Sequence, residues 1–266
     1  MKETSFKKQF ATTITACLAF LILSLAPAAA HFAWVTSDNY SPMPGDEITI
    51  DIAWGHKFPG DGRLGRQAYE YTKLEIIDPE GQRKTVTVMP EEEKGNKPVK
   101  IKMEKQGNHT ILLTQKTFSS KTTKGYKAQP KNELENVLVS RWSETVSKSV
   151  VTAGPAEKGF SNGDTGDRFQ IFPLENPLKL EKNEFLPVKV TLDGKPWGGK
   201  VYATYEGFTD MADTFAYTTV TDKEGVARIK MLEKGLWLIM AEHSYPYEDT
   251  KKADEYALKA TLTFKN

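Results

Sequence analysis

The stretch DEITIDIAW, residues 46–54, decides the fold class. Ile48, Ile50, Ile52 and Trp54 occupy alternate positions and are separated by polar residues or alanine. A period of two places these four side chains on one face of an extended chain, which is the pattern of a β-strand with one buried face. The stretch therefore predicts a strand that packs one side against a core.

Similar strand patterns continue toward the C-terminus. KLEIIDPEGQRKTVTV, residues 73–88, predicts two strands joined by a turn, because Asp-Pro-Glu-Gly is a turn-forming sequence. Apolar residues alternate again over residues 186–192, and a DGKP turn follows them. Residues 131–150 fit either a short helix or a strand. Strand patterns dominate the remainder, so the sequence favours an all-β protein.

A polar segment divides these strands into two groups. TAGPAEKGFSNGDTGDR, residues 152–168, is rich in Gly, Pro, Ser and Asp and has no apolar period, which is typical of a linker or a long loop. Short strands separated by turn residues at this spacing favour β-sandwiches. We therefore expect two tandem Ig-like β-sandwich domains, over residues 31–153 and 168–266, joined by a linker at residues 154–167.

Residues 1–30 have the pattern of a secretory signal peptide. A basic start precedes an apolar run, and Ala28-Ala29-Ala30 supplies an A-x-A cleavage site. The apolar run is shorter than the roughly 20 residues that span a bilayer, so cleavage is favoured over a membrane anchor. We expect a mature chain that begins at His31 and is soluble in the periplasm.

Charge and cysteine content exclude several kinds of site and partner. The formal net charge of the whole chain is +1, which gives no reason to expect nucleic acid or an anionic membrane as a partner. Cys17, the only cysteine, lies in the predicted leader. The mature chain would therefore have no disulfide and no thiolate ligand.

Histidines are the main candidates for a functional site. A mature His31 would offer a metal both its α-amine and its imidazole, in one chelate ring. His56 in AWGHKF and His243 in MAEHSYP lie at predicted strand ends, next to the loops where sites are often built. An ordinary structural role is the alternative for each of them. His109, in a QGNHT turn, is expected at the surface and outside the site.

The predicted ligand set consists of nitrogen atoms. Without thiolates it suits Ni, Co, Cu or Zn better than Mg or Ca. A carboxylate could orient a ligand histidine from outside the metal's own shell, and spacing does not choose among the candidates. These candidates are Asp38, Asp51, Asp61, Glu206 and Glu242.

Motifs that would indicate an enzyme occur in the wrong context. GDGRLG, residues 60–65, matches a dinucleotide-binding loop but precedes a predicted strand instead of a helix. GFSNG, residues 159–163, matches a serine elbow but lies in the polar linker. There is no H-E-x-x-H motif. We therefore expect a protein that is not an enzyme.

The order and spacing of several segments resemble the bacterial DUF4198 family. These segments are AHFAWV after the leader, IAWGHKFPG at 52–60, SRWSETVSKSVVTAG at 140–154, FPLENPLKLEKNEFLPVKVTLDGKPWGGKVYATYEG at 172–207 and TVTDKEGVARIKMLEKGLWLIMAEH at 219–243. The resemblance implies an exported, two-part β fold linked with nickel or cobalt uptake. The histidines that recur in the family fall on His31, His56 and His243.

Together these observations predict a periplasmic protein that captures Ni²⁺ or Co²⁺ through His31, His56 and His243 and supports its uptake by a membrane transporter. Two alternatives remain open. The first is a copper protein with a histidine brace, in which a terminal histidine binds Cu²⁺ through its amine and its ring. The second is a structural or glycan-binding β-sandwich protein without a metal. The sequence also leaves open the oligomeric state and whether His243 reaches His31.

Overall fold

Strand β2 (Glu47–Gly55) carries the alternation that predicts the fold. Ile48, Ile50 and Ile52 are buried in the core, while Glu47 at the start of the strand is exposed. The strand pairs antiparallel with β1 (Phe32–Ser37) on one side and with β5 (Val99–Lys102) on the other. These three strands form a small sheet of their own.

The computed structural model describes residues 31–60, 62–91, 95–155 and 163–266. Within these ranges the chain forms sixteen strands and three 3-10 helices, η1 (Arg66–Tyr71), η2 (Lys131–Glu133) and η3 (Pro177–Lys179). The all-β prediction is confirmed. The predicted leader with Cys17, and most of the GFSNG segment, lie outside the described residues. In the described ranges, no helix has the length and apolar character needed to cross a membrane.

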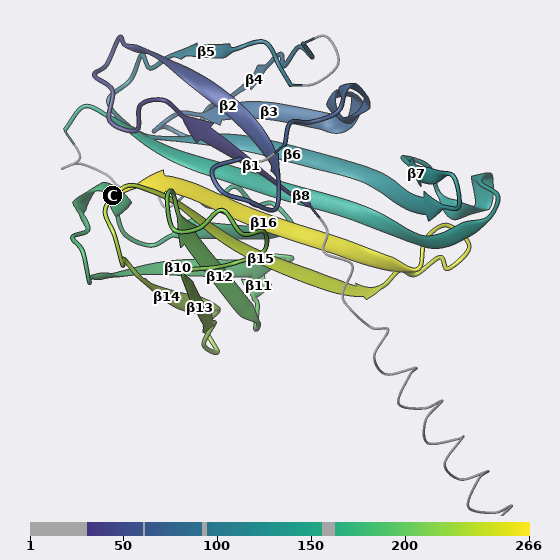
Figure 1. Cartoon of the computed structure of the whole chain (residues 1–266). Helices are drawn as coiled ribbons and strands as arrows, with labels where there is room; N and C mark the ends of the chain where they lie inside the picture. The colour runs from purple at the N-terminus through teal and green to yellow at the C-terminus, as the bar shows by residue number, and fades with distance from the viewer. Residues whose placement is uncertain (1–30, 61, 92–94, 156–162) are drawn as a thin grey trace, which may run out of the picture. The chain divides into compact units, whose positions relative to one another are not determined.

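The largest sheet has nine strands and joins the two halves of the sequence (Figure 1). Its order is β13-β12-β15-β16-β8-β6-β3-β4, and β7 pairs with β6. The strands are β3 (Thr72–Ile77), β4 (Arg83–Val86), β6 (Gly107–Thr122), β7 (Gly125–Lys127), β8 (Val137–Ala153), β12 (Lys200–Tyr205), β13 (Tyr217–Val220), β15 (Leu236–Pro246) and β16 (Glu255–Lys265). Most of the segment at residues 131–150 is thus strand β8, which pairs parallel with β16.

A third sheet belongs to the C-terminal half. Its order is β11-β10-β14, and β9 also pairs with β10. The strands are β9 (Phe169–Pro173), β10 (Phe185–Leu192), β11 (Lys195–Pro196) and β14 (Val226–Lys230).

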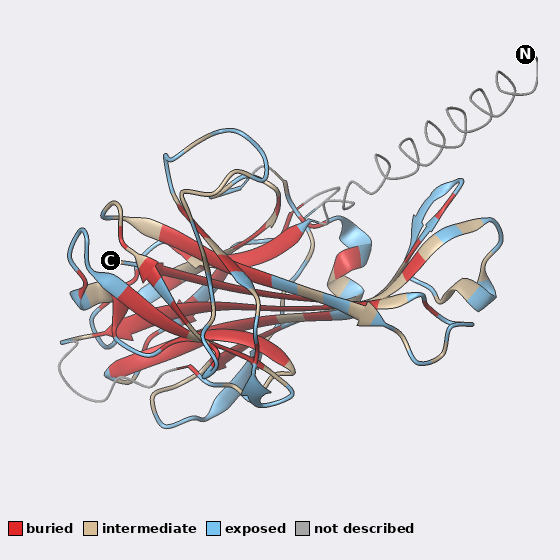
Figure 2. Ribbon diagram, turned by 90° about the horizontal axis from the view of Figure 1, so that it is seen from below, coloured by how far each residue is buried: buried red, intermediate tan, exposed pale blue. Residues whose placement is uncertain are grey.

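The two small sheets cover opposite faces of the large one. Val150 belongs to the hydrophobic core of the C-terminal half, and its neighbour Val151 belongs to the core of the N-terminal half. Successive residues of a strand point to opposite faces, so β8 separates the two cores. Figure 2 shows the buried residues along the stacked strands and the exposed residues mainly in the connecting turns. The sandwich-like packing agrees with the predicted fold class.

The predicted domains share the large sheet. Each segment, 31–153 and 168–266, contributes strands to it, and residues 31–266 cluster as one compact unit. Each segment also has its own core on one side of this sheet. The boundaries at residues 153 and 168, taken as limits of independently folding domains, stay a prediction.

Candidate metal centre

The register of β1 and β2 brings His31 and His56 together. The last residues paired in this antiparallel ladder are Phe32 and Gly55. The next residues outward are His31 and His56, which therefore lie opposite each other across the strand ends. Their ring centroids are 4.3 Å apart and the rings are tilted by 52°. Two of the three predicted ligands thus meet.

Trp54 holds the ring of His31. The indole stacks on the imidazole with a centroid distance of 3.9 Å and an interplanar angle of 13°. Trp54 lies two residues before His56 on the same strand, so it is the diagonal neighbour of His31 across the ladder. This stacking limits the orientations open to the His31 ring, which is otherwise exposed.

Asp213 orients the ring of His56. The Nδ1 atom of His56 lies 2.8 Å from a carboxylate oxygen of Asp213. A carboxylate oxygen accepts, so Nδ1 carries the hydrogen, and in the neutral ring the lone pair then lies on Nε2. The backbone N–H of Asp213 also donates to the carbonyl of His56 over 3.1 Å. The loop between β12 and β13 is thereby attached to the end of β2 at two points.

The polar face of β16 holds β1 in place. Lys259 Nζ donates to the carbonyl of His31 over 2.6 Å, and Thr261 Oγ1 donates to the carbonyl of Ala33 over 2.9 Å. Thr263 repeats this contact with the carbonyl of Val35. These donors come from alternate residues of β16 and meet alternate carbonyls of β1. The start of β1, and with it His31, is therefore fixed to the large sheet.

Lys259 is a buried cation beside the candidate centre. Its ammonium lies 5.2 Å from the centroid of the Phe32 ring. Burial lowers the pKa of Lys259 to about 8, although the charge of Glu242 acts in the opposite direction.

A small cavity borders His56. Its volume is about 20 Å³, which is room for a single water molecule. His56 and Asp213 line it together with Phe32 and Met240. Side chains from both halves of the sequence therefore line the cavity next to His56.

His243 does not join the pair. It follows Trp237, Ile239 and Ala241 at alternate positions of β15, and these three belong to the C-terminal core. Leu238 and Met240, which line the cavity beside His56, point to the other face of the same strand. The predicted set of three histidines is therefore not assembled in this structure.

The surroundings of His243 are aromatic. Its ring centroid lies 5.2 Å from that of Tyr245, 5.9 Å from Trp197 and 6.3 Å from Phe169. Burial lowers its pKa, which favours a neutral ring. This environment is that of a packed structural histidine.

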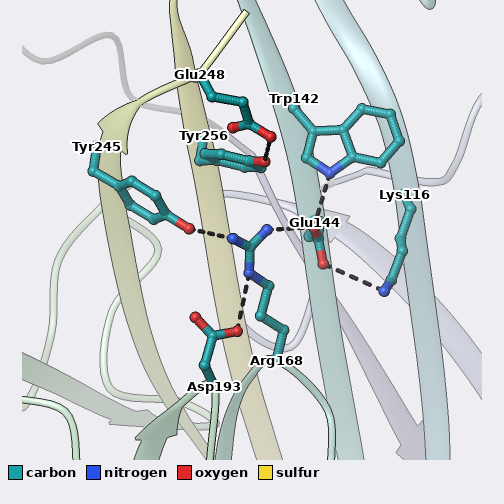
Figure 3. Close-up of polar contacts among 8 residues, drawn as sticks. All are labelled: Lys116, Trp142, Glu144, Arg168, Asp193, Tyr245, Glu248 and Tyr256. Carbon is teal, nitrogen blue, oxygen red and sulfur yellow. Dashed lines mark hydrogen bonds and ion pairs between the residues drawn. The ribbon is translucent and has the colours of Figure 1, made fainter.

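A polar cluster near His243 centres on Arg168 (Figure 3). The guanidinium contacts Glu144 over 3.1 Å, Asp193 over 3.3 Å and the hydroxyl of Tyr245, and it lies 4.4 Å from the Tyr256 ring centroid. These contacts come from β8, β15, β16 and the turn after β10. The cluster ties the large sheet to the sheet that covers its C-terminal half.

The structure changes two sequence-based predictions, the exposure of His109 and the identity of the carboxylate that orients a histidine of the pair. His109 was expected at the surface, but it is only 4% exposed. It lies at the start of β6 on the face of the N-terminal core, where its Nδ1 donates to the carbonyl of Gly107 over 3.2 Å. Asp213 was not among the proposed orienting carboxylates. Among those that were, Asp51 pairs with Arg63, and Asp61 lies outside the described residues.

Side chains alone do not complete a metal site. Among the described residues, no group of three or more His, Cys, Asp or Glu side chains is placed to hold an ion. The two imidazoles would need a third donor. The α-amine of His31 would supply it once the chain begins at that residue.

Comparison with known proteins places the chain in one family. The model of the family described as "Domain of unknown function (DUF4198)" matches residues 28–245. No curated protein matches. A solved structure, the native conformation of alpha-2-macroglobulin from E. coli, is similar at 10% identity with a TM-score of 0.25. The match covers 89% of this chain and 14% of that one, and a likeness of this size supports no functional conclusion.

Proposed function

The chain belongs to the DUF4198 family, and from this premise we propose that its mature form holds one divalent transition-metal ion at His31 and His56. The ion is cargo, bound by reversible coordination and without a catalytic step. The donors are the imidazoles of both residues and the α-amine of His31. The contact between the two rings, with centroids 4.3 Å apart, is the observation that carries this proposal.

The ring separation suits two ligands on one ion. Metal–nitrogen bonds are about 2.0–2.1 Å long, so imidazoles at adjacent coordination positions bring their centroids to within about 4–5 Å. The Asp213 carboxylate leaves Nε2 of His56 as the donor atom. A carboxylate that holds the other ring nitrogen is a frequent companion of metal-binding histidines.

Copper is the second candidate cargo beside the nickel or cobalt implied by the family resemblance. The observation that favours copper is that His243 lies among aromatic side chains and away from the histidine pair. Three nitrogen donors then remain, the two imidazoles and the α-amine of His31. Such a set suits the tetragonal geometry of Cu²⁺, which also stands above nickel and cobalt in the Irving–Williams order. We further propose that the protein works in the periplasm and passes its ion to a membrane transporter.

A titration of four ions tests the proposal. Protein that begins at His31 is titrated with Ni²⁺, Co²⁺, Cu²⁺ and Zn²⁺ in a calorimeter, beside the variants His56→Ala and His243→Ala. We expect binding of one ion, its loss in His56→Ala and its retention in His243→Ala. No binding of any ion, or a loss of binding in His243→Ala alone, would overturn the proposal. The first of these results would favour the structural or glycan-binding alternative.

A further inference from the structure

A second cavity opens at the edge of the N-terminal sandwich, away from the histidine pair. Its volume is about 510 Å³, within the range of about 300–1,000 Å³ for small-molecule sites. It lies between β4, the edge strand of the large sheet, and β5, the edge strand of the small sheet (Figure 1). The two facing sheets thus leave a cleft between their edges.

The inner part of the cleft is apolar. Ile76 of the large sheet and Ile101 of the small sheet both line the cleft and belong to the N-terminal core. Val86 of β4 also lines the cleft and packs against this core. An apolar group of a ligand would therefore be removed from water here.

Lys84 brings a charge to this apolar part. The register pairs Lys84 with Ile76 and Val86 with Leu74. Directly opposed residues point to the same face of a sheet, so Lys84 lies on the face that Leu74 and Ile76 turn toward the core. Its long stem can follow the apolar wall while the ammonium reaches the cleft opening.

The cleft has an excess of positive charge. Asp78 and Glu104 are its acidic lining residues. Its basic lining residues are Arg83, Lys84, Lys100, Lys102 and Lys105. Lys100 pairs with Glu47, and Lys105 pairs with Asp78 and Glu80. Within the described ranges, Lys84 and Lys102 form no ion pair, so two cations at the cleft lack a neutralising partner.

His109 lines the cleft from β6. Its Nδ1 donates to the carbonyl of Gly107, so the neutral ring presents Nε2 as an acceptor. Burial lowers the pKa of His109 and keeps the ring neutral near pH 7. This histidine is therefore not a cation for an anionic ligand. Of the two unpaired lysines, Lys84 shares the face of Ile76, whereas Lys102 follows the buried Ile101 and points to the other face of its strand.

We propose that the cleft binds an organic carboxylate that carries an apolar group. The apolar group lies against Ile76, Val86 and Ile101, and the carboxylate pairs with Lys84. An inward-pointing lysine on an edge strand can also serve only to prevent pairing with another strand. A ligand titration distinguishes the two roles, because only the first makes binding depend on a carboxylate in the ligand.

The probe is 2-naphthoate, with 2-naphthylmethanol and acetate as partial ligands that lack the charge or the apolar group. Backbone amide signals of ¹⁵N-labelled protein are followed during each titration. We expect 2-naphthoate to shift the signals of β4 and β5 and to bind about tenfold more tightly than 2-naphthylmethanol, as for a ligand with a charged hydrogen-bond partner. Acetate should bind more weakly than both.

Variants separate the two roles of the lysine. Lys84→Gln should remove the preference for 2-naphthoate, whereas Lys223→Gln, in the exposed turn between β13 and β14, should keep it. The proposal is overturned if 2-naphthoate and 2-naphthylmethanol bind equally to the unmodified protein. It is also overturned if the shifts lie outside the cleft, or if Lys84→Gln keeps the preference while its unfolding curve is unchanged.

Discussion

His31 and His56 face each other across β1 and β2, one residue beyond the last pair of their ladder, with ring centroids 4.3 Å apart. This relationship follows from strand register alone. A shift of β1 by one residue would reverse which face its side chains point to and would separate the rings. The centre therefore depends on everything that holds β1 in register.

Asp213 should raise the affinity for metal without touching the ion. Asp213→Asn removes the charge that holds Nδ1 of His56, and loss of such an outer partner typically lowers metal affinity by about 10- to 100-fold. Competition titration with a chelator of known affinity measures the change. Asp210→Asn, an exposed change in the same loop, is the control and should leave the affinity unaltered. Equal affinities for the two variants would show that the His56–Asp213 contact has no effect on binding.

Thr261 should stabilise the protein through its bond to β1. Thr261→Val keeps the shape of the side chain but removes the donor to the carbonyl of Ala33, in a site with no exposure. A buried acceptor that loses its partner costs about 1–3 kcal/mol. Urea unfolding should show this loss of free energy, and the exposed control Thr218→Val on β13 should not. A loss of the same size in both variants would contradict the role of Thr261.

Lys148 should make stability depend on pH above neutrality. This fully buried lysine donates to the carbonyl of Gly163 and to Gln170, and burial lowers its pKa to about 7, against the charges of Asp167 and Asp164. From pH 7 upward the unfolded chain keeps a proton that the folded chain has lost. The free energy of unfolding should therefore rise with pH, by up to about 1.4 kcal/mol per unit.

The rise in the free energy of unfolding that is due to Lys148 is best measured between pH 7 and 8. Lys259, with a pKa of about 8, adds a further rise at higher pH. Below pH 7 both states carry the Lys148 proton, so its contribution to the slope disappears. Urea unfolding at several pH values measures the slope. Lys148→Met should flatten it in this range, and an unchanged slope in that variant would show that Lys148 does not titrate as described.

The sequence predicts the strands better than it predicts their faces. The alternation at Ile48, Ile50 and Ile52 is confirmed because one face of β2 is buried. Polar and apolar residues alternate in β16, which is the pattern of a strand with one face in solvent. The polar residues Lys259, Thr261 and Thr263 are nevertheless all buried under β1. Contacts between residues far apart in the chain decide this burial, and no local pattern reports them.

The same limit explains the outcome for the candidate centre. His31 and His56 lie on neighbouring strands, so register brings them together. His243 lies on β15, where consecutive apolar residues point to opposite faces of the sheet. It shares the face of Trp237, Ile239 and Ala241, which belong to the C-terminal core, and so points away from His56. Asp213 lies in a loop of the other half, and its contact with His56 depends on how the sheets are joined.

The starting residue of the mature chain is the most direct test of the proposed centre. Metal affinity is measured for protein that begins at His31 and for protein that begins at Ala30 and is otherwise identical. The added residue converts the α-amine of His31 into an amide and removes one donor of the chelate ring. We predict a loss larger than the 10- to 100-fold typical of an outer partner; equal affinities for the two forms would contradict a centre built on the terminus of His31.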